Sequence, residues 1–317
     1  MICKICCKES SNEVFQAKEM LGGSRDSFDY LECSECGSLS LLEVPSDMSI
    51  YYGNSHYGSF SETQSSYLKK IFRVSRNKYA FLRKGGLLGR FLNWLRPLTY
   101  EFTCIAEHQG LDAKILDVGC GAGWYINWLH EIGFTNVNGI DPFIDKDQFY
   151  KNGVTVKKKY MHEVDEKYDA ILSHHQFEHV PDPLKTLCDI KDKLNPDGIC
   201  ILTVPVAEDL YRKYKENCYL IQAPQHFFLY SIRGFLILAK KAGFKVELMH
   251  RDATTTAMWY KYSELWKKDI AHSEIEGSLD NCFDEIDLKE FSSIENSLVK
   301  AKSGDNVTFL LKAVNSE

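Results

Sequence analysis

Hydrophobic residues from position 114 onward recur in short runs that alternate with helical patterns. Runs of this kind predict β-strands. They are KILDV (114–118), NVNGID (136–141), VTVKK (154–158), YDAILS (168–173), GICILTV (198–204), FKVELMH (244–250) and VTFLLKAV (307–314). Helices are predicted from about Ala122, briefly after residue 141, around 183–194 and around 231–242. The alternation indicates an α/β fold with a doubly wound, mostly parallel, seven-stranded sheet that has helices on both faces.

The rest of the chain divides into segments of different character. Residues 1–45 are rich in cysteine and turn residues, residues 46–64 are polar and rich in tyrosine, and residues 65–100 are basic with helical spacing. Residues 253–304 separate the last two strands and contain charged helical patterns, which favours an inserted cap over a bare loop. We therefore expect three regions: 1–45, a lid or linker with a basic helical segment at 46–100, and 101–317 with a helical insertion at 253–304.

Composition places the chain among globular proteins. Of its 317 residues, 44% are hydrophobic and 26% are charged, and the formal net charge is −6. An acidic balance argues against a general nucleic-acid binder. No apolar run reaches the length of a membrane-spanning helix, and the N-terminus lacks the apolar core of a signal peptide. We therefore expect a cytoplasmic protein.

Two C-x2-C pairs near the N-terminus indicate a metal site. Cys3 and Cys6 form the first pair and Cys33 and Cys36 the second, with 26 residues between the pairs. Four thiolates at such spacing suit tetrahedral zinc, and a site with four sulfur ligands leaves no open position, so a structural zinc ribbon is expected. Cys7 could replace Cys6. The region 1–45 has four basic and eight acidic residues, so its net charge is negative, which disfavours binding to the phosphates of a nucleic acid.

A glycine-rich loop follows the first predicted strand of the large region. Gly119, Gly121 and Gly123 follow Asp117 in a G-x-G-x-G pattern, and Asp141 ends the next strand 24 positions after Asp117. Glycines at the carboxyl end of a strand let the backbone approach a ligand closely, and an acidic side chain there can accept hydrogen bonds from ribose hydroxyls. A dinucleotide-binding dehydrogenase is the alternative for this pattern, although its glycine spacing differs.

This set of motifs resembles the class I S-adenosylmethionine-dependent methyltransferases. The resemblance rests on ILDVGCGAG (115–123), GIDP (139–142), YDAILSHHQFEHVPDP (168–183), LNPDGICILTVP (194–205) and QHFFLYS…AKKAGF (225–244). It implies that the strand at 307–314 is the family's antiparallel edge strand. The implied cofactor-binding residues are Gly119, Gly121 and Gly123 under the methionine part, Asp141 on the ribose, Asp117 at the loop or the ammonium group, and Ser173 and His174 beside the sulfonium.

A zinc ribbon fused to this fold resembles two groups of enzymes. One comprises bacterial methyltransferases of sugar and polysaccharide pathways, and the other comprises guanine-N1 ribosomal RNA methyltransferases. The acidic ribbon favours the first group.

Histidines in the same motifs are candidates for catalysis. An acceptor hydroxyl needs a base or a metal, and histidine titrates near neutrality. His226 lies in the loop after the fifth strand, where the resemblance places acceptor-facing residues; a buried structural histidine is the alternative.

His175, Glu178 and His179 would share one face of a helix. Ubiquinone-pathway O-methyltransferases, which this segment resembles, carry Glu, Glu and His there and can hold a divalent cation. Here His175 replaces the first Glu, which makes a cation less expected than a loop-orienting role for Glu178 and His179.

Two further segments have open interpretations. Tyr51, Tyr52, Ser55, His56 and Tyr57 form either a lid over the cofactor or an ordered linker. From Ser66 to Arg96 the chain has nine basic residues and no acidic one. That segment could recognise an anionic acceptor such as a sugar nucleotide, dock on an anionic membrane through Phe91, Trp94 and Leu95, or simply cover the sheet as a solvated helix.

The sequence therefore supports three functions in descending order. The first is methyl transfer to a small molecule or glycan, most reasonably a sugar hydroxyl or carbon. The second is methylation of a ribosomal RNA base, and the third is a non-enzymatic binding module that keeps the fold.

Overall fold

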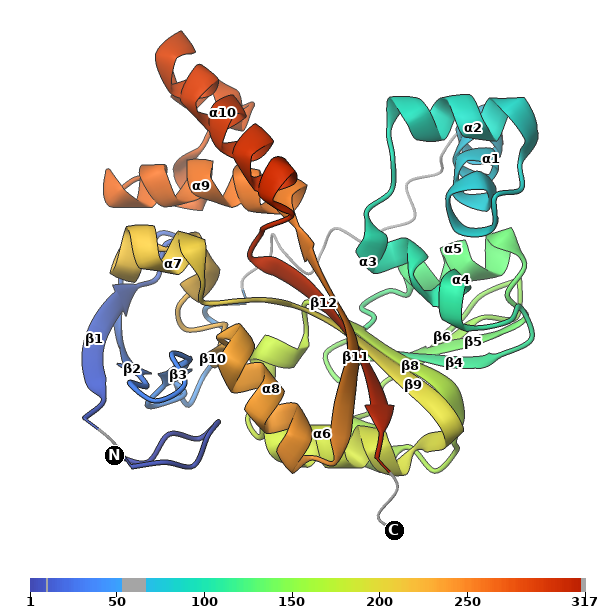
Figure 1. The fold of residues 1–317 in the computed structure, drawn as a ribbon, viewed down its shortest axis with the longest axis horizontal. Coiled ribbons are helices and arrows are strands. Elements are labelled where there is room, and N and C mark those ends of the chain that lie inside the picture. The colour runs from blue at the N-terminus through green and yellow to red at the C-terminus, as the bar shows by residue number, and fades with distance from the viewer. Residues whose placement is uncertain (10, 53–66, 315–317) are drawn as a thin grey trace.

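The computed structural model describes residues 1–9, 11–52 and 67–314, and its largest element is a twisted central sheet (Figure 1). Within those residues the sheet has eight strands in the order β11-β12-β9-β8-β4-β5-β7-β6. Their bounds are β4 (Lys114–Val118), β5 (Asn136–Ile140), β6 (Gln148–Phe149), β7 (Thr155–Lys157), β8 (Tyr168–His174), β9 (Leu194–Pro205), β11 (Phe244–Asp252) and β12 (Asn306–Ala313). The pairs β4–β5, β4–β8, β5–β7 and β8–β9 are parallel, which confirms a mostly parallel sheet.

Alternating side chains of the strands enter two separate cores, one on each face of the sheet. On β9, Cys200 and Leu202 pack with α6 (Pro183–Asp192) and α8 (Ile232–Lys241), whereas Ile199 and Ile201 pack with α5 (Trp124–Ile132). Leu116 and Ile115 divide in the same way on β4. A strand buried on both faces reads as a continuous apolar run, which is why these strands were visible in the sequence.

Three details of the sheet differ from the sequence-based expectation. An eighth strand, β6, pairs antiparallel with β7, and at two residues it is too short to show an alternating pattern. The strand β12 is antiparallel, as expected, but lies between β9 and β11 instead of at the edge. Residues 142–153 form turns and β6, with no helix, because this stretch is dominated by charged and polar residues.

A second sheet joins the N-terminal region to the rest of the chain. Its order is β1 (Glu13–Lys18), β2 (Ser27–Glu32), β3 (Leu39–Leu41) and β10 (Phe228–Leu229), and all of its pairings are antiparallel. The strand β10 begins at the last residue of the QHFF motif, Phe228, which pairs with Ser40. The ribbon is therefore continuous with a loop of the large region.

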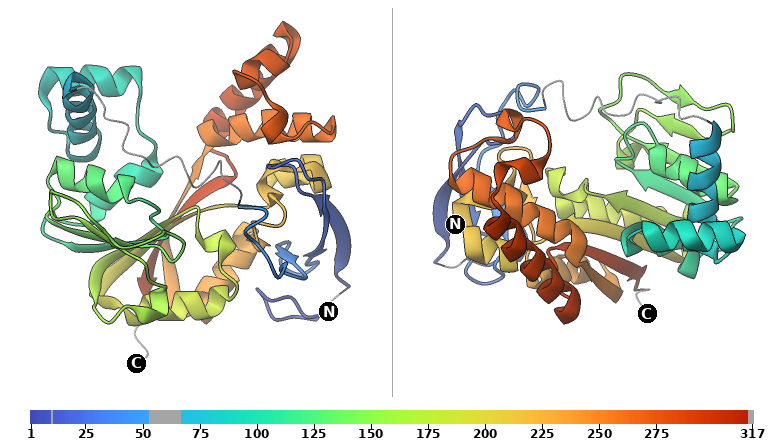
Figure 2. Two further views of the ribbon diagram at one scale, coloured as in Figure 1. Left: turned by 180° about the vertical axis from the view of Figure 1, so that it is seen from behind. Right: turned by 90° about the horizontal axis from the view of Figure 1, so that it is seen from above.

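Helical segments lie around these sheets. They are α1 (Tyr67–Leu82), α2 (Gly86–Leu95), α3 (Tyr100–Thr103), α4 (Ile105–His108), α7 (Asp209–Tyr214), α9 (Ala253–Lys267) and α10 (Glu285–Ala301). The hairpin of α1 and α2 lies at the opposite end of the molecule from the N-terminal ribbon in all three views (Figures 1 and 2). Within the described ranges, no helix is both long enough and apolar enough to cross a bilayer.

Candidate functional site

The glycine loop has a backbone that only glycine adopts without strain at several positions. Gly119, Gly121 and Gly123 have φ angles of 72°, 54° and 73°, in the left-handed region. A Cβ on Gly123 would lie 2.7 Å from Cγ2 of Val156, so a side chain there is excluded by space as well. The loop lies at the carboxyl end of β4 and leads into α5, the position where open α/β sheets bind ligands.

Asp141 fixes this loop to the end of the neighbouring strand. Its side chain is 3% exposed, and its two carboxylate oxygens accept hydrogen bonds from the backbone N–H groups of Gly121 (2.9 Å) and Phe143 (2.8 Å). Each carboxylate oxygen can accept more than one hydrogen bond, so acceptor capacity remains for a ligand hydroxyl.

Asp117 lies buried at the end of β4, close to Asp141. Burial, and secondarily the negative charge of Asp141, raise the pKa of Asp117 to about 8. The carboxyl group is therefore mostly protonated at neutral pH. A positively charged group placed beside it would restore the ionised form.

The end of β8 holds Ser173 and His174. Ser173 is buried, and its hydroxyl donates to Oε1 of Gln176 at 3.3 Å. His174 has Nδ1 3.2 Å from Oγ1 of Thr203, and its ring meets that of Tyr125 edge-on at 4.9 Å. Burial lowers the pKa of His174 to about 4, so this imidazole is neutral at physiological pH.

His175 lies between two carboxylates, one of them the predicted neighbour Glu178 and the other Glu101. Its φ of 51° is strained for a residue with a side chain, and the side chain is 39% exposed. Its Nε2 lies 3.9 Å from Glu101, and its Nδ1 lies 3.7 Å from Glu178. Burial opposes protonation, but the two carboxylates outweigh it and raise the pKa of His175 to about 10. An imidazole that stays protonated at neutral pH cannot accept a proton.

Glu178, His179 and His226 form a compact group. Their ligand atoms lie within 4.8 Å of one another, and Nε2 of His226 is 4.0 Å from Oε1 of Glu178. Nδ1 of His179 lies 2.8 Å from the carbonyl oxygen of Gln225, and Nδ1 of His226 lies 2.7 Å from that of Leu220. These contacts make Nδ1 the protonated nitrogen and leave each Nε2 as an acceptor.

The same group corrects the expected set of cation ligands. The structure groups Glu178 and His179 with His226, whereas the sequence suggested His175 as the third member. His175 lies near Glu178 but also pairs with Glu101. Both carboxylate oxygens of Glu178 are buried and have no hydrogen-bond partner among the described residues. Two imidazoles and one carboxylate would suit a divalent transition metal.

Tyr51 and Tyr52 of the tyrosine-rich segment lie beside the site. The ring of Tyr52 stacks on that of Phe143 at 6.3 Å and lies 6.4 Å from that of His179. Gln225 donates to the carbonyl oxygen of Tyr51 at 2.6 Å. The remaining residues predicted for a lid, Ser55, His56 and Tyr57, lie outside the described residues.

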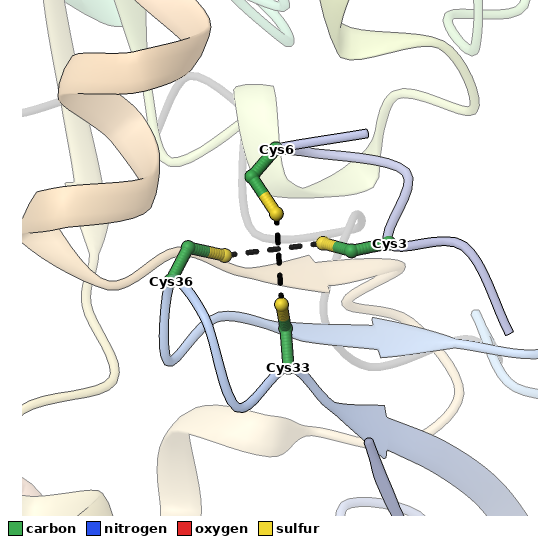
Figure 3. A group of neighbouring side chains, drawn as sticks. All are labelled: Cys3, Cys6, Cys33 and Cys36. Atoms are coloured by element: carbon green, nitrogen blue, oxygen red, sulfur yellow. Dashed lines mark hydrogen bonds between the residues drawn. The ribbon is translucent and has the colours of Figure 1, made fainter. Parts of the chain in front are cut away.

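The four paired cysteines converge on one point from two turns of the ribbon (Figure 3). Cys3, Cys6, Cys33 and Cys36 are buried, and the opposed sulfur pairs lie 3.8 Å (Cys3–Cys36) and 3.6 Å (Cys6–Cys33) apart. Tetrahedral zinc with Zn–S bonds of about 2.3 Å requires sulfurs about 3.8 Å apart. The donor set therefore fits zinc, and Cys7 is exposed outside the cluster.

Two residues of the site were missed by the sequence analysis. Glu101, on α3, is 8% exposed and accepts a hydrogen bond from Asn306 at 2.7 Å. Burial would raise its pKa, but His175 and the other partners lower it to about 2. Tyr30, on β2, donates to the carbonyl oxygen of His226 at 2.8 Å. Neither residue lies in a motif, so only the folded arrangement brings them to the site.

Comparison with known proteins assigns the family. The sequence profile of a family described as a methyltransferase domain matches residues 88–248, just over half of the chain. The chain therefore belongs to this methyltransferase domain family. This result confirms the methyltransferase interpretation of the glycine motif over the dehydrogenase alternative.

Individual relatives cover smaller shares of the chain. A ubiquinone biosynthesis O-methyltransferase of Haemophilus ducreyi is 31% identical, covering 35% of this chain and 53% of the relative. A tRNA U34 carboxymethyltransferase of Nautilia profundicola is 30% identical, covering 34% and 40%. The chain thus spans about half or less of the length of these relatives. A solved mycolic acid cyclopropane synthase complexed with SAH and CTAB is 16% identical, with a TM-score of 0.44, covering 82% of this chain and 99% of that one.

Proposed function

We propose that the protein transfers a methyl group from S-adenosylmethionine to a small-molecule or glycan acceptor, most reasonably to a sugar hydroxyl or carbon. One observation carries the proposal: in a chain of the methyltransferase domain family, the glycine loop is fastened to Asp141 at the carboxyl ends of β4 and β5. The relation to an O-methyltransferase supports a hydroxyl acceptor. The choice of a sugar acceptor rests on the resemblance of a zinc ribbon fused to this fold to methyltransferases of sugar and polysaccharide pathways.

Cofactor binding is assigned to the loop and the adjacent strand ends. The backbone at Gly119, Gly121 and Gly123 would cradle the methionine part, and Asp141 would accept from the ribose hydroxyls. Asp117 would face the ammonium group, with Ser173 and His174 near the sulfonium. When bound, the cofactor supplies an activated methyl group for in-line displacement.

His179 is the general base in this proposal. Its Nδ1 is held by the carbonyl oxygen of Gln225, so Nε2 is free to accept a proton. The ring is only partly buried, unlike that of His226, so an acceptor molecule has access to it, and the ring of Tyr52 lies beside it. A positioned base typically contributes about 10²–10⁴-fold in rate. The buried carboxylate of Glu178 would stabilise the imidazolium that forms when His179 accepts the proton.

The other two candidate histidines have supporting roles. Burial and the charge of neighbouring His179 lower the pKa of His226 to about 3, which makes it a poor base at neutral pH. His226 instead packs beside the buried carboxylate of Glu178, with its Nε2 4.0 Å from Oε1. His175 stays protonated between Glu101 and Glu178 and holds both carboxylates ionised. A divalent cation held by Glu178, His179 and His226 would supply Lewis-acid activation of a hydroxyl in place of the base.

Zinc bound by Cys3, Cys6, Cys33 and Cys36 is structural in this proposal. The four buried sulfurs satisfy its coordination without an open position, so no substrate can reach the metal. Its role is to hold the N-terminal turn before β1 to the turn that joins β2 and β3. The strand β3 in turn pairs with β10, in the segment after His226.

The test is release of S-adenosylhomocysteine with a panel of hydroxylated acceptors, including sugar nucleotides. His179→Gln should abolish turnover and leave S-adenosylmethionine affinity unchanged, whereas the exposed His162→Gln should behave like wild type. Full turnover by His179→Gln would remove this residue from the mechanism. Failure of the wild type to bind S-adenosylmethionine would end the proposed activity altogether.

RNA methylation is the second candidate, because one relative modifies a tRNA. It predicts methyl transfer to tRNA or ribosomal RNA and an affinity for RNA that falls steeply with salt. Incorporation of labelled methyl groups into RNA, with none into sugar nucleotides, would favour it over the glycan acceptor.

A further inference from the structure

The helix α2 presents an apolar face with no cover among the described residues. Leu87 is 84% exposed, Phe91 54%, Trp94 74% and Leu95 58%. At 100° per residue these side chains occupy one side of the helix. Gly89 lies on the opposite side, where a Cβ would collide with the carbonyl oxygen of Ser75 on α1. Because close packing against α1 fixes the orientation of α2, the apolar side faces away from the protein.

The same hairpin is the most basic part of a chain that is otherwise acidic. From Ser66 to Arg96 there are nine basic residues and no acidic one, and since the whole chain carries −6, the remainder carries −15. Lys70 and Arg73 pair with Glu131 of α5 and so fasten the hairpin to the methyltransferase domain. Exposed basic residues without an ion pair in the described part of the chain flank the apolar face. They are Arg83, Lys84, Arg90 and Arg96.

We propose that the α1–α2 hairpin docks on an anionic lipid bilayer, with α2 lying in the plane of the interface. Leucine, phenylalanine and tryptophan on one face, with basic residues around it, are what an interfacial helix requires. Aliphatic Leu87 and Leu95 gain nothing from contact with phosphates alone, so the combination favours a lipid surface over RNA. Figures 1 and 2 show α2 at the periphery of the molecule.

Docking would be driven by two additive contributions. Apolar side chains of α2 enter the boundary between headgroups and acyl chains, and the basic residues are attracted by the negative surface potential. Each basic residue near an anionic membrane strengthens binding by roughly fivefold at low ionic strength. Binding should therefore require both the anionic lipid and the apolar face.

The experiment is co-sedimentation of the full chain with vesicles of phosphatidylglycerol and phosphatidylcholine in equal parts. Wild type should sediment with these vesicles and not with phosphatidylcholine alone. The variant L87S/F91S/W94S and the variant R83E/K84E/R90E should each lose binding by about tenfold or more. Near-ultraviolet circular dichroism checks that each variant is folded.

Matched controls are available at α9 and α10. Ile286→Ser removes another highly exposed apolar side chain, at 76%, and K267E/K289E/K300E reverses three exposed charges there. Both controls should bind vesicles like wild type. The proposal is overturned if wild type ignores anionic vesicles at low salt, or if the controls lose as much binding as the α2 variants. It is also overturned if tRNA displaces the protein from vesicles at stoichiometric amounts, or if the apolar face buries itself in a stable dimer that L87S/F91S/W94S dissociates.

Discussion

The hydroxyl group of Tyr30 donates a hydrogen bond of 2.8 Å to the carbonyl oxygen of His226, which links the ribbon to a candidate site residue. Tyr30 lies on β2 and is fully buried. One strand further, β3 pairs with β10, which begins two residues after His226. The N-terminal region therefore supports the loop that carries His226, in addition to holding the four-cysteine cluster.

Replacing Tyr30 by phenylalanine tests this support. Tyr30→Phe leaves the carbonyl oxygen of His226 buried without its donor, which should cost about 1–3 kcal/mol of the free energy of unfolding. Turnover should fall because His226, no longer held by Tyr30, would shift relative to Glu178. The dissociation constant for S-adenosylmethionine should stay the same. Urea unfolding, steady-state kinetics and calorimetry measure the three quantities.

A second buried tyrosine supplies the control for that variant. Tyr211 donates its hydroxyl hydrogen to Glu32 of β2 at 2.6 Å, and not to the carbonyl oxygen of His226, which Tyr30 occupies. Tyr211→Phe should lose a similar amount of stability and keep its turnover. Equal loss of turnover in both variants would mean that general destabilisation, rather than the position of His226, explains the effect.

Disrupting the cysteine cluster should release the whole ribbon. Cys33→Ser removes one of four sulfur ligands, so bound zinc should fall from about one ion per chain and the melting temperature should drop. Cys7→Ser is the matched change, because Cys7 is exposed and lies outside the cluster. Elemental analysis together with calorimetric melting is decisive: identical zinc content in the two variants would contradict the assigned ligands.

Cofactor affinity should depend on pH through Asp117. The pKa of this carboxyl group is raised to about 8, so below that pH it is protonated and must release a proton to face a positive charge. The affinity for S-adenosylmethionine should therefore rise by up to about tenfold per pH unit on approaching pH 8 from below, and level off above it. Calorimetry in buffers of different ionisation enthalpy would detect the released proton.

Asp117→Asn separates this effect from other titrating groups. The amide cannot ionise, so the affinity for S-adenosylmethionine should no longer change over the two pH units below the pKa of about 8. A wild-type affinity that is flat over this range would show that Asp117 does not face the positive part of the cofactor.

Much of the large region could be predicted because its central strands β4, β8 and β9 are buried on both faces. Continuous apolar runs such as ILDV on β4 and ICILTV on β9 have few alternatives to a parallel strand. The short strand β6 and the interior place of β12 could not be predicted, because two residues carry no periodicity and strand order depends on packing between distant segments.

The site was predictable where its residues lie in one motif and not where the fold brings segments together. The glycine loop and Asp141 are joined by a hydrogen bond at the expected strand ends. The pairing of His175 with Glu101 was not foreseen, because Glu101 lies 74 positions earlier in a short helix without a recognisable pattern. For the same reason the grouping of His226 with Glu178 required the folded structure.

The most direct test of the account is calorimetric titration of S-adenosylmethionine into wild type, Asp141→Ala and the exposed control Asp145→Ala. Wild type and Asp145→Ala should bind alike, and Asp141→Ala should bind more weakly by about 1.5–3 kcal/mol, because charge-assisted hydrogen bonds are lost. Asp141→Asn, which keeps one acceptor oxygen, should lose less. An unchanged dissociation constant in Asp141→Ala, or no binding by wild type, would contradict the proposed cofactor site.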